Sequence, residues 1–162
     1  METLRNVLYK LEKAVDKCIV LVCGSMLLGI TALIFIQVIF RYILQNSISW
    51  SEELTRYMMV WIVFLASGYV LSKGGHANID MLLNRFSPKM RSVAVKGSLL
   101  LIMVFSGLVI RYGFMLMRFG KRQISSALEI PMNYVYLAIP IGGALLIFYC
   151  LVLLCRRQGE AP

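Results

Sequence analysis

The sequence predicts an all-α integral membrane protein with four transmembrane helices, short interfacial amphipathic helices and both termini in the cytoplasm. Three observations support this fold class: an apolar composition, four long apolar runs, and an excess of basic residues on one side of them. Apolar residues make up 59% of the 162 residues and charged residues 15%, with a mean hydropathy of +0.76. A soluble domain is about 45–50% apolar and about 25% charged, and so short a chain cannot enclose the excess apolar surface. The composition therefore argues against a soluble enzyme, a disordered tail and a disulfide-rich secreted module.

The chain is expected to form a single membrane domain over residues 1–162, in which an interfacial helix at residues 1–17 precedes four spans. The spans are expected at about residues 18–40, 54–72, 93–115 and 132–155. The first and last runs are uncharged and long enough for a hydrocarbon core of roughly 30 Å. The uncharged part of the second run is short, so its helix is expected to begin earlier, near Ser51. The third run is bounded by Lys96 and Arg111, so at least one of these charges must lie within the bilayer boundary.

Basic residues determine the expected orientation. Eleven of the seventeen Lys and Arg residues lie in the N-terminal segment, the middle loop and the C-terminal tail, and six lie on the other side of the spans. Because cytoplasmic segments carry the excess of Lys and Arg, both termini are expected in the cytoplasm. The resulting net charge of +9 is interpreted as topology signals and contacts with membrane lipids rather than as a surface for nucleic acid.

Four residues are expected to have structural roles. Pro140 is expected to bend the fourth span, and Pro131 lies just before that span begins. His76 and Asp80 stand four residues apart in the loop after the second span. We favour a local hydrogen bond at a helix start over a metal site with only two ligands or a pH switch.

The chain lacks the residues that catalysis in a membrane requires. Its single histidine, His76, cannot supply the two axial ligands of a haem b. The cysteines form two pairs with a spacing of five, Cys18/Cys23 and Cys150/Cys155, which matches neither a C-x-x-C redox pair nor a zinc site. They are interpreted as reduced, buried small hydrophobic residues. No catalytic, metal or cofactor site is therefore expected, and the chain is not expected to be an enzyme.

Candidate contacts with a partner lie near the outer ends of the first two spans. These residues are Gln37, Arg41, Trp50, Glu52, Glu53, Arg56 and Trp61. Glu52 and Glu53 occupy a first helical turn, where acids offset the helix dipole, and Glu52 with Arg56 forms an ordinary i,i+4 pair. The alternative is that these acids contact another protein. Gln37 and Arg41 lie one turn apart, and Trp50 and Trp61 belong to an aromatic stripe. Each pair either contacts lipid headgroups and other helices of this chain or contacts a partner protein.

An ordered set of segments resembles the small membrane subunit of tripartite ATP-independent periplasmic (TRAP) transporters, the DctQ-like family. The segments are residues 37–42 (QVIFRY), 49–56 (SWSEELTR), 61–65 (WIVFL), 75–80 (GHANID), 126–136 (SALEIPMNYVY) and 140–142 (PIG). The resemblance covers about residues 18–150 in the expected order. It implies a multi-pass protein of the bacterial inner membrane.

The resemblance also implies a non-catalytic scaffold or accessory subunit of a sodium-coupled importer of an organic acid, such as a C4-dicarboxylate or sialic acid. The implied partners are a large multi-span membrane subunit, which is expected to hold the sodium, and a periplasmic substrate-binding protein. The runner-up from the residues is a small homodimeric proton-coupled exporter, which would normally need an acidic residue at mid-membrane. A third possibility is an orphan structural or regulatory membrane protein.

Overall fold

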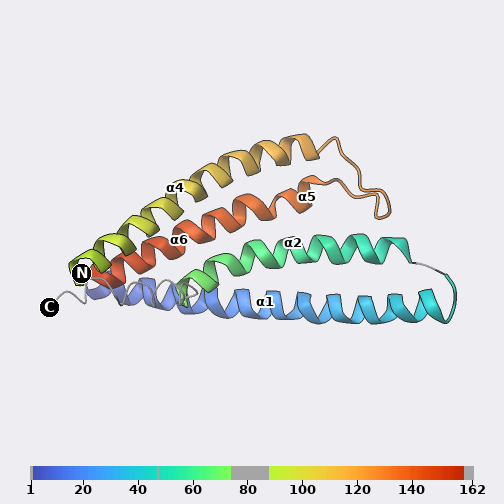
Figure 1. Cartoon of the computed structure of the whole chain (residues 1–162), viewed down its shortest axis with the longest axis horizontal. Helices are drawn as coiled ribbons and strands as arrows, with labels where there is room; N and C mark the ends of the chain where they lie inside the picture. The colour runs from blue at the N-terminus through green and yellow to red at the C-terminus, as the bar shows by residue number, and fades with distance from the viewer. Residues whose placement is uncertain (1, 47, 74–87, 159–162) are drawn as a thin grey trace.

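The computed structural model describes residues 2–46, 48–73 and 88–158 (Figure 1). Its helices are α1 (Glu2–Tyr42), α2 (Ser49–Ser72), α4 (Pro88–Gly120), α5 (Asn133–Tyr136) and α6 (Ala138–Gln158). Four segments are long and apolar enough to cross a membrane: Tyr9–Tyr42, Ser49–Ser72, Val93–Gly120 and Asn133–Cys155. The predicted all-α class with four membrane helices is confirmed. Within the described residues the only β pairing is an isolated bridge between Ile124 and Pro131.

The first helix is longer than expected at its N-terminal side. α1 runs from Glu2 to Tyr42 without a break, so residues 2–17 continue the first span rather than forming a separate helix. Residues 2–17 contain neither proline nor glycine, so no residue within this segment interrupts the helix. α2 begins at Ser49, close to the start near Ser51 that the short apolar run implies.

Pro140 accounts for the interruption between α5 and α6. Proline has no backbone N–H, so Pro140 cannot donate the helical hydrogen bond to the carbonyl of Tyr136, four residues earlier. α5 ends at Tyr136 and α6 begins at Ala138. The intervening Leu137 keeps helical dihedral angles, φ −61° and ψ −26°. The chain therefore continues in nearly the same direction, as Figure 1 shows.

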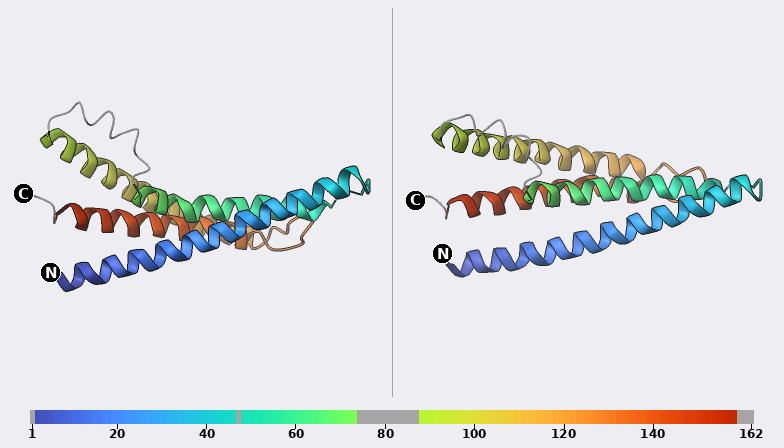
Figure 2. Two further views of the ribbon diagram at one scale, coloured as in Figure 1. Left: turned by 90° about the horizontal axis from the view of Figure 1, so that it is seen from below. Right: turned by 60° about the horizontal axis from the view of Figure 1, so that its bottom comes forward.

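α6 is the central helix of the bundle. It packs between α2 and α4, while α1 packs mainly against α2 (Figures 1 and 2). Of the 18 most apolar residues of the span Asn133–Cys155, 39% are buried, against 6% for the span Tyr9–Tyr42. Close approach depends on paired glycines in α6: a Cβ at Gly142 would lie 2.7 Å from the Phe64 carbonyl oxygen, and one at Gly143 would lie 2.8 Å from Cγ1 of Ile110. Small residues of this kind allow membrane helices to pack tightly.

The four cysteines are not equally covered. All four are free, Cys150 is buried and Cys23 is half-buried, but Cys18 and Cys155 are exposed. The expectation of burial is therefore wrong for Cys18 and Cys155. Each of these helices buries only the stripe that faces its neighbours, so Ile19 is buried whereas the adjacent Cys18 faces outward.

The bundle has two distinct ends. The N- and C-terminal helix ends lie at one end, here called the terminal end (Figure 1). The turn after α1 and the segment between α4 and α5 lie at the other end, here called the loop end. The start of α1 at Glu2 and the end of α6 at Gln158 therefore lie on the same side, as an even number of antiparallel spans requires.

Candidate functional site at the loop end

The segment of residues 121–132 between α4 and α5 forms a short hairpin-like loop. The backbone N–H of Ser125 donates to the carbonyl of Ile130 at 3.0 Å, and that of Met132 donates to the carbonyl of Gln123 at 2.9 Å. Glu129 closes the turn in the left-handed region, with φ +53°, which few residues other than glycine adopt. Because this loop is held by its own backbone bonds, it presents a defined surface at the loop end.

Glu53 of α2 anchors this loop. Its carboxylate accepts hydrogen bonds from three successive backbone N–H groups, those of Ser126 at 3.3 Å, Ala127 at 2.8 Å and Leu128 at 3.0 Å. The Tyr57 hydroxyl donates a further bond to Glu53 at 2.5 Å. Consecutive backbone N–H groups form a natural anion site, and hydrogen bonds to a charged acceptor are stronger than neutral ones. Glu53 therefore joins α2 to the loop between α4 and α5.

The adjacent acid, Glu52, is placed quite differently. Its carboxylate lies 3.8 Å from the Arg56 guanidinium, and the side chains of Glu52 and Arg56 are 65% and 69% exposed. Exposed pairs of this kind add little stability. In the sequence, Glu52 and Glu53 are equivalent first-turn acids. In the structure, Glu53 bonds to the loop of residues 121–132, whereas Glu52 lies at the surface. Tyr57, four residues after Glu53 on the same helix face, is the only local signal that separates them.

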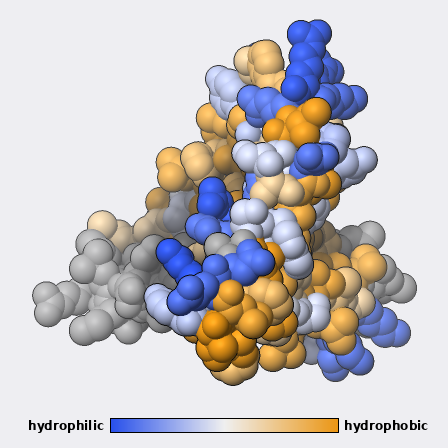
Figure 3. Space-filling model, turned by 90° about the vertical axis from the view of Figure 1, so that its right-hand side faces the viewer, coloured by the Kyte–Doolittle hydropathy of each residue, from blue (hydrophilic) through white to orange (hydrophobic). Residues whose placement is uncertain are grey.

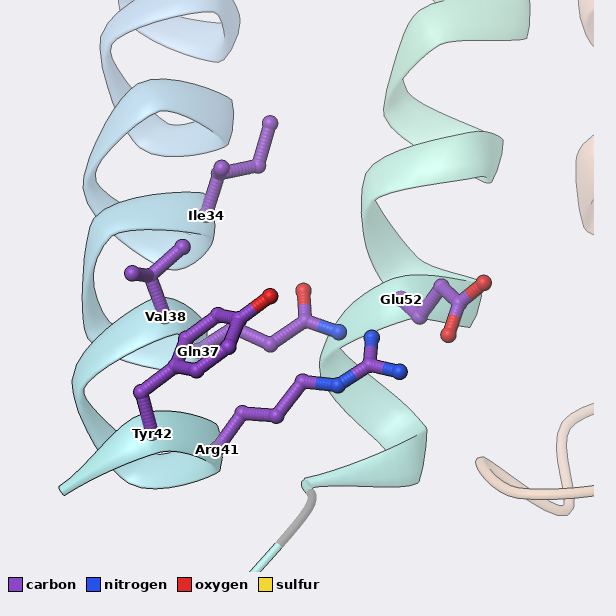
Figure 4. A pocket seen from close by; sticks show the side chains of 6 residues that line it. All are labelled: Ile34, Gln37, Val38, Arg41, Tyr42 and Glu52. Carbon is purple, nitrogen blue, oxygen red and sulfur yellow. The ribbon is translucent and has the colours of Figure 1, made fainter.

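An open groove between α1 and α2 brings three of the candidate residues together. It has a volume of about 320 Å³ and is lined by Ile34, Gln37, Val38, Arg41, Tyr42 and Glu52. In Figure 4 the side chains of Gln37 and Arg41 extend from α1 toward α2, while the Glu52 carboxylate points away from α1. The groove thus combines apolar side chains on one part of its α1 wall with amide and guanidinium donors on the other.

The remaining candidate residues lie outside this groove. Trp50 is exposed and Trp61 is half-buried on α2, as an aromatic stripe along a membrane helix predicts. Pro131 takes part in the bridge with Ile124 at the base of the loop. His76 and Asp80 lie outside the described residues. The loop end also carries hydrophilic residues along the edge where α4 ends (Figure 3), and the basic residues of that segment, Arg118, Lys121 and Arg122, are exposed.

A second polar cluster, at the terminal end, was not recognised from the sequence. Asp16 of α1 accepts a hydrogen bond from Lys73 Nζ at 2.7 Å and from the Tyr149 hydroxyl at 2.6 Å. Tyr149 is fully buried and packs over Gly68, where a Cβ would lie 2.7 Å from its ring. The Lys73 ammonium also lies 5.3 Å from the centre of the Tyr69 ring. The hydrogen bond to Asp16 raises the pKa of Lys73, with a smaller opposing effect of burial. The cluster joins α1, α2 and α6.

The spacing of the two clusters matches a membrane. Glu53 and Lys73 mark the two polar ends of α2 and stand twenty residues apart. At a rise of about 1.5 Å per residue this separation is about 30 Å, which equals the thickness of a typical hydrocarbon core. The bundle therefore has an apolar zone between two polar layers, one at each end.

Comparison with known proteins is consistent with this architecture. The family described as "Tripartite ATP-independent periplasmic transporters, DctQ component" matches residues 30–159. The chain is 33% identical over 117 residues to the C4-dicarboxylate TRAP transporter small permease protein DctQ of Rhodobacter capsulatus, an alignment that covers 70% of this chain and 52% of that protein. It is 23% identical over 131 residues to a putative TRAP transporter small permease protein of Haemophilus influenzae, covering 81% of each.

A larger protein is also similar. The sialic acid TRAP transporter permease protein SiaT of Haemophilus influenzae is 25% identical over 125 residues, which cover 77% of this chain but 20% of that protein. The chain thus spans about half the length of the Rhodobacter relative and a fifth of SiaT. These relatives are transport components, and the prediction that the chain is not an enzyme is confirmed by them.

Proposed function

The chain belongs to the DctQ component family of tripartite ATP-independent periplasmic transporters, and from this premise we propose that it is the small, non-catalytic subunit of a sodium-coupled organic-acid importer. It works with a large multi-span membrane subunit and a periplasmic substrate-binding protein. The observation that carries the proposal is the apolar zone between the two polar layers. A membrane segment that moves sodium or protons normally needs an acidic side chain. Among the described residues this zone contains none.

The substrate is a C4-dicarboxylate, sialic acid or a related carboxylate. The relatives named for their substrates carry one or the other of these acids. We assign substrate recognition and sodium binding to the partner chains, because the groove at the loop end is open rather than enclosing.

We place the chain in the bacterial inner membrane with both termini in the cytoplasm. The excess of basic residues at the terminal end supports this orientation. The loop end then faces the periplasm, and the groove and the loop held by Glu53 lie on the side from which a binding protein approaches.

The contact surface for the partners includes exposed and half-buried candidate residues of α1 and α2. Gln37, Arg41 and Glu52 line the groove, with Trp50, Arg56 and Trp61 nearby on α2. Glu53 has a different role: it positions the loop of residues 121–132 rather than contacting a partner itself.

The test is reconstitution of purified components in liposomes. We expect uptake of a radiolabelled organic acid only when the chain, the large subunit, the binding protein and an inward sodium gradient are all present. Omitting the chain should abolish or strongly reduce uptake. Export by the chain alone, driven by a proton gradient, would instead support a small homodimeric exporter and overturn the proposal.

A further inference from the structure

Arg111 is a charged residue on the outer face of α4. The opposite face of this helix packs against α6: a Cβ at Gly113 would lie 2.9 Å from both Ile139 and Pro140. Two residues correspond to about 200° around a helix of 3.6 residues per turn, so Arg111 points away from α6. Its side chain is accordingly exposed.

Arg111 also lies deep inside the apolar zone. Its neighbour Ile110 contacts Gly143, and the adjacent Gly142 contacts Phe64 of α2. Phe64 stands nine residues from Lys73 and eleven from Glu53, which correspond to about 14 Å and about 16 Å along the helix. This layer is therefore near the middle of the zone between the two polar layers. Along α4 itself, Arg111 lies about 10 Å before Arg118.

The described part of the chain offers Arg111 no acidic partner. Asp16 is engaged by Lys73 and Tyr149, Glu53 by the loop and Glu52 by Arg56. Glu12 lies near Asp16 in α1, and Glu129 lies in the outer loop. Neither is near the middle of the zone, so the described residues supply no compensating charge for Arg111.

The face around Arg111 is shaped for another helix. Gly97, Val104, Arg111 and Arg118 recur every seven residues along it, and all are exposed. A Cβ added at Gly97 would meet nothing within 4 Å, and neither would one at Gly107, about one turn before Arg111. Small residues on an open face let a second membrane helix approach closely, and an ionisable residue inside a membrane segment is almost always paired or faces protein.

We propose that this face of α4 packs against a transmembrane helix of the large subunit and that Arg111 pairs there with a carboxylate. The inference rests on the proposed function. It specifies the α4 face and the charged residue through which the chain contacts the large subunit. A lipid phosphate is a weaker partner because headgroups lie at the boundary of the hydrocarbon core. A second copy of this chain is weaker too, since its described residues hold no acid at this depth.

The experiment uses the complex of chain and large subunit, purified through a tag on the chain. The variants are Arg111→Gln, Arg111→Lys and the matched control Arg118→Gln, which removes the same charge from the same face at the end of α4. We expect Arg111→Gln to lower recovery of the large subunit by more than about tenfold, as loss of one partner of a buried charge pair does. Arg111→Lys and Arg118→Gln should retain most of it.

Membrane levels of the chain separate lost binding from lost folding. Glutamine removes a charge from the apolar zone, so the Arg111→Gln chain should insert at least as well as wild type. Equal recovery of the large subunit with Arg111→Gln and wild type would overturn the inference. If the wild-type chain itself recovers no large subunit, the proposed function fails, which is a separate result.

A photo-crosslinking residue at Leu108, which is exposed one turn before Arg111, identifies what covers this face. We expect an adduct with the large subunit. Adducts only with lipid, or only with a second copy of the chain, would contradict the proposal.

Discussion

The two ends of the bundle each hold a carboxylate, but they hold it with different groups. At the loop end, Glu53 is bound mainly by backbone N–H groups of a loop. At the terminal end, Asp16 is bound by the side chains of Lys73 and Tyr149. Backbone donors belong to the fold and do not titrate, whereas the Lys73 ammonium can lose its proton. Three of the four donors to Glu53 are backbone groups, so in the alkaline range the loop-end contact should depend less on pH than the terminal-end contact.

The contacts also differ in what they connect. Glu53 joins α2 to the loop between α4 and α5, a segment with a single backbone bridge of its own. Asp16 joins α1 to α2 and α6, which are already packed helices. α1 contacts α6 far less than it contacts α2. Loss of Glu53 should therefore release a loop, while loss of Asp16 should loosen one helix.

Replacing Glu53 should have the largest effect. In Glu53→Ala the N–H groups of residues 126–128 lose their acceptor, and those of Ala127 and Leu128 are partly shielded from water, where a donor left without a partner is costly. We expect a clear fall in thermal stability in detergent and several-fold faster trypsin cleavage at Lys121 and Arg122, the first two residues of the released loop. The matched control is Glu52→Ala on the adjacent, exposed position, where both readouts should stay close to wild type. Equal effects at the two positions would contradict the anchoring role of Glu53.

Replacing Asp16 should have an intermediate effect. Asp16→Asn removes the charge that Lys73 and Tyr149 share, while its side chain is only 13% exposed, and we expect a loss of about 1–2 kcal/mol in stability. Thermal unfolding in detergent measures it. Lys17→Gln, the neighbouring exposed position, serves as the control and should change little. An unchanged Asp16→Asn protein would show that helix packing alone holds α1.

Much of the fold was predictable because it follows from local composition. The four spans appear as apolar runs. Pro140 was expected to bend the last span, and the structure has instead an interruption at this place with little change of direction. The extent of α1 was less predictable. Amphipathic spacing in residues 1–17 is compatible with a separate interfacial helix and with a continuous one, since no residue in it terminates a helix.

The site was less predictable because its contacts join distant parts of the chain. Glu53 binds residues more than seventy positions away in the sequence, and Asp16 binds Tyr149, which is 133 positions away. No local pattern identifies such partners. Gln37, Arg41 and Glu52 were grouped from their positions at span ends, and the structure does place them around one groove. Burial of Cys18 and Cys155 was mispredicted because an apolar run shows which segment enters the membrane and not which face is covered.

The pH dependence of stability should show the smallest of these effects. The hydrogen bond to Asp16 raises the pKa of Lys73 above its ordinary value of 10.5. A raised folded pKa adds stability that is fully present below the unfolded pKa and is lost as pH rises through the folded one. Between pH 9 and pH 11.5 the stability advantage of wild type over Lys73→Gln should therefore shrink, measured as the difference between their melting temperatures in detergent. The Lys73 side chain is 52% exposed, so the difference should be small. Glu53→Ala should lose a more nearly constant amount of stability over this range, because three of the four donors to Glu53 are backbone N–H groups that keep their protons. A loss as strongly pH-dependent as that of Lys73→Gln would remove the distinction between the two ends.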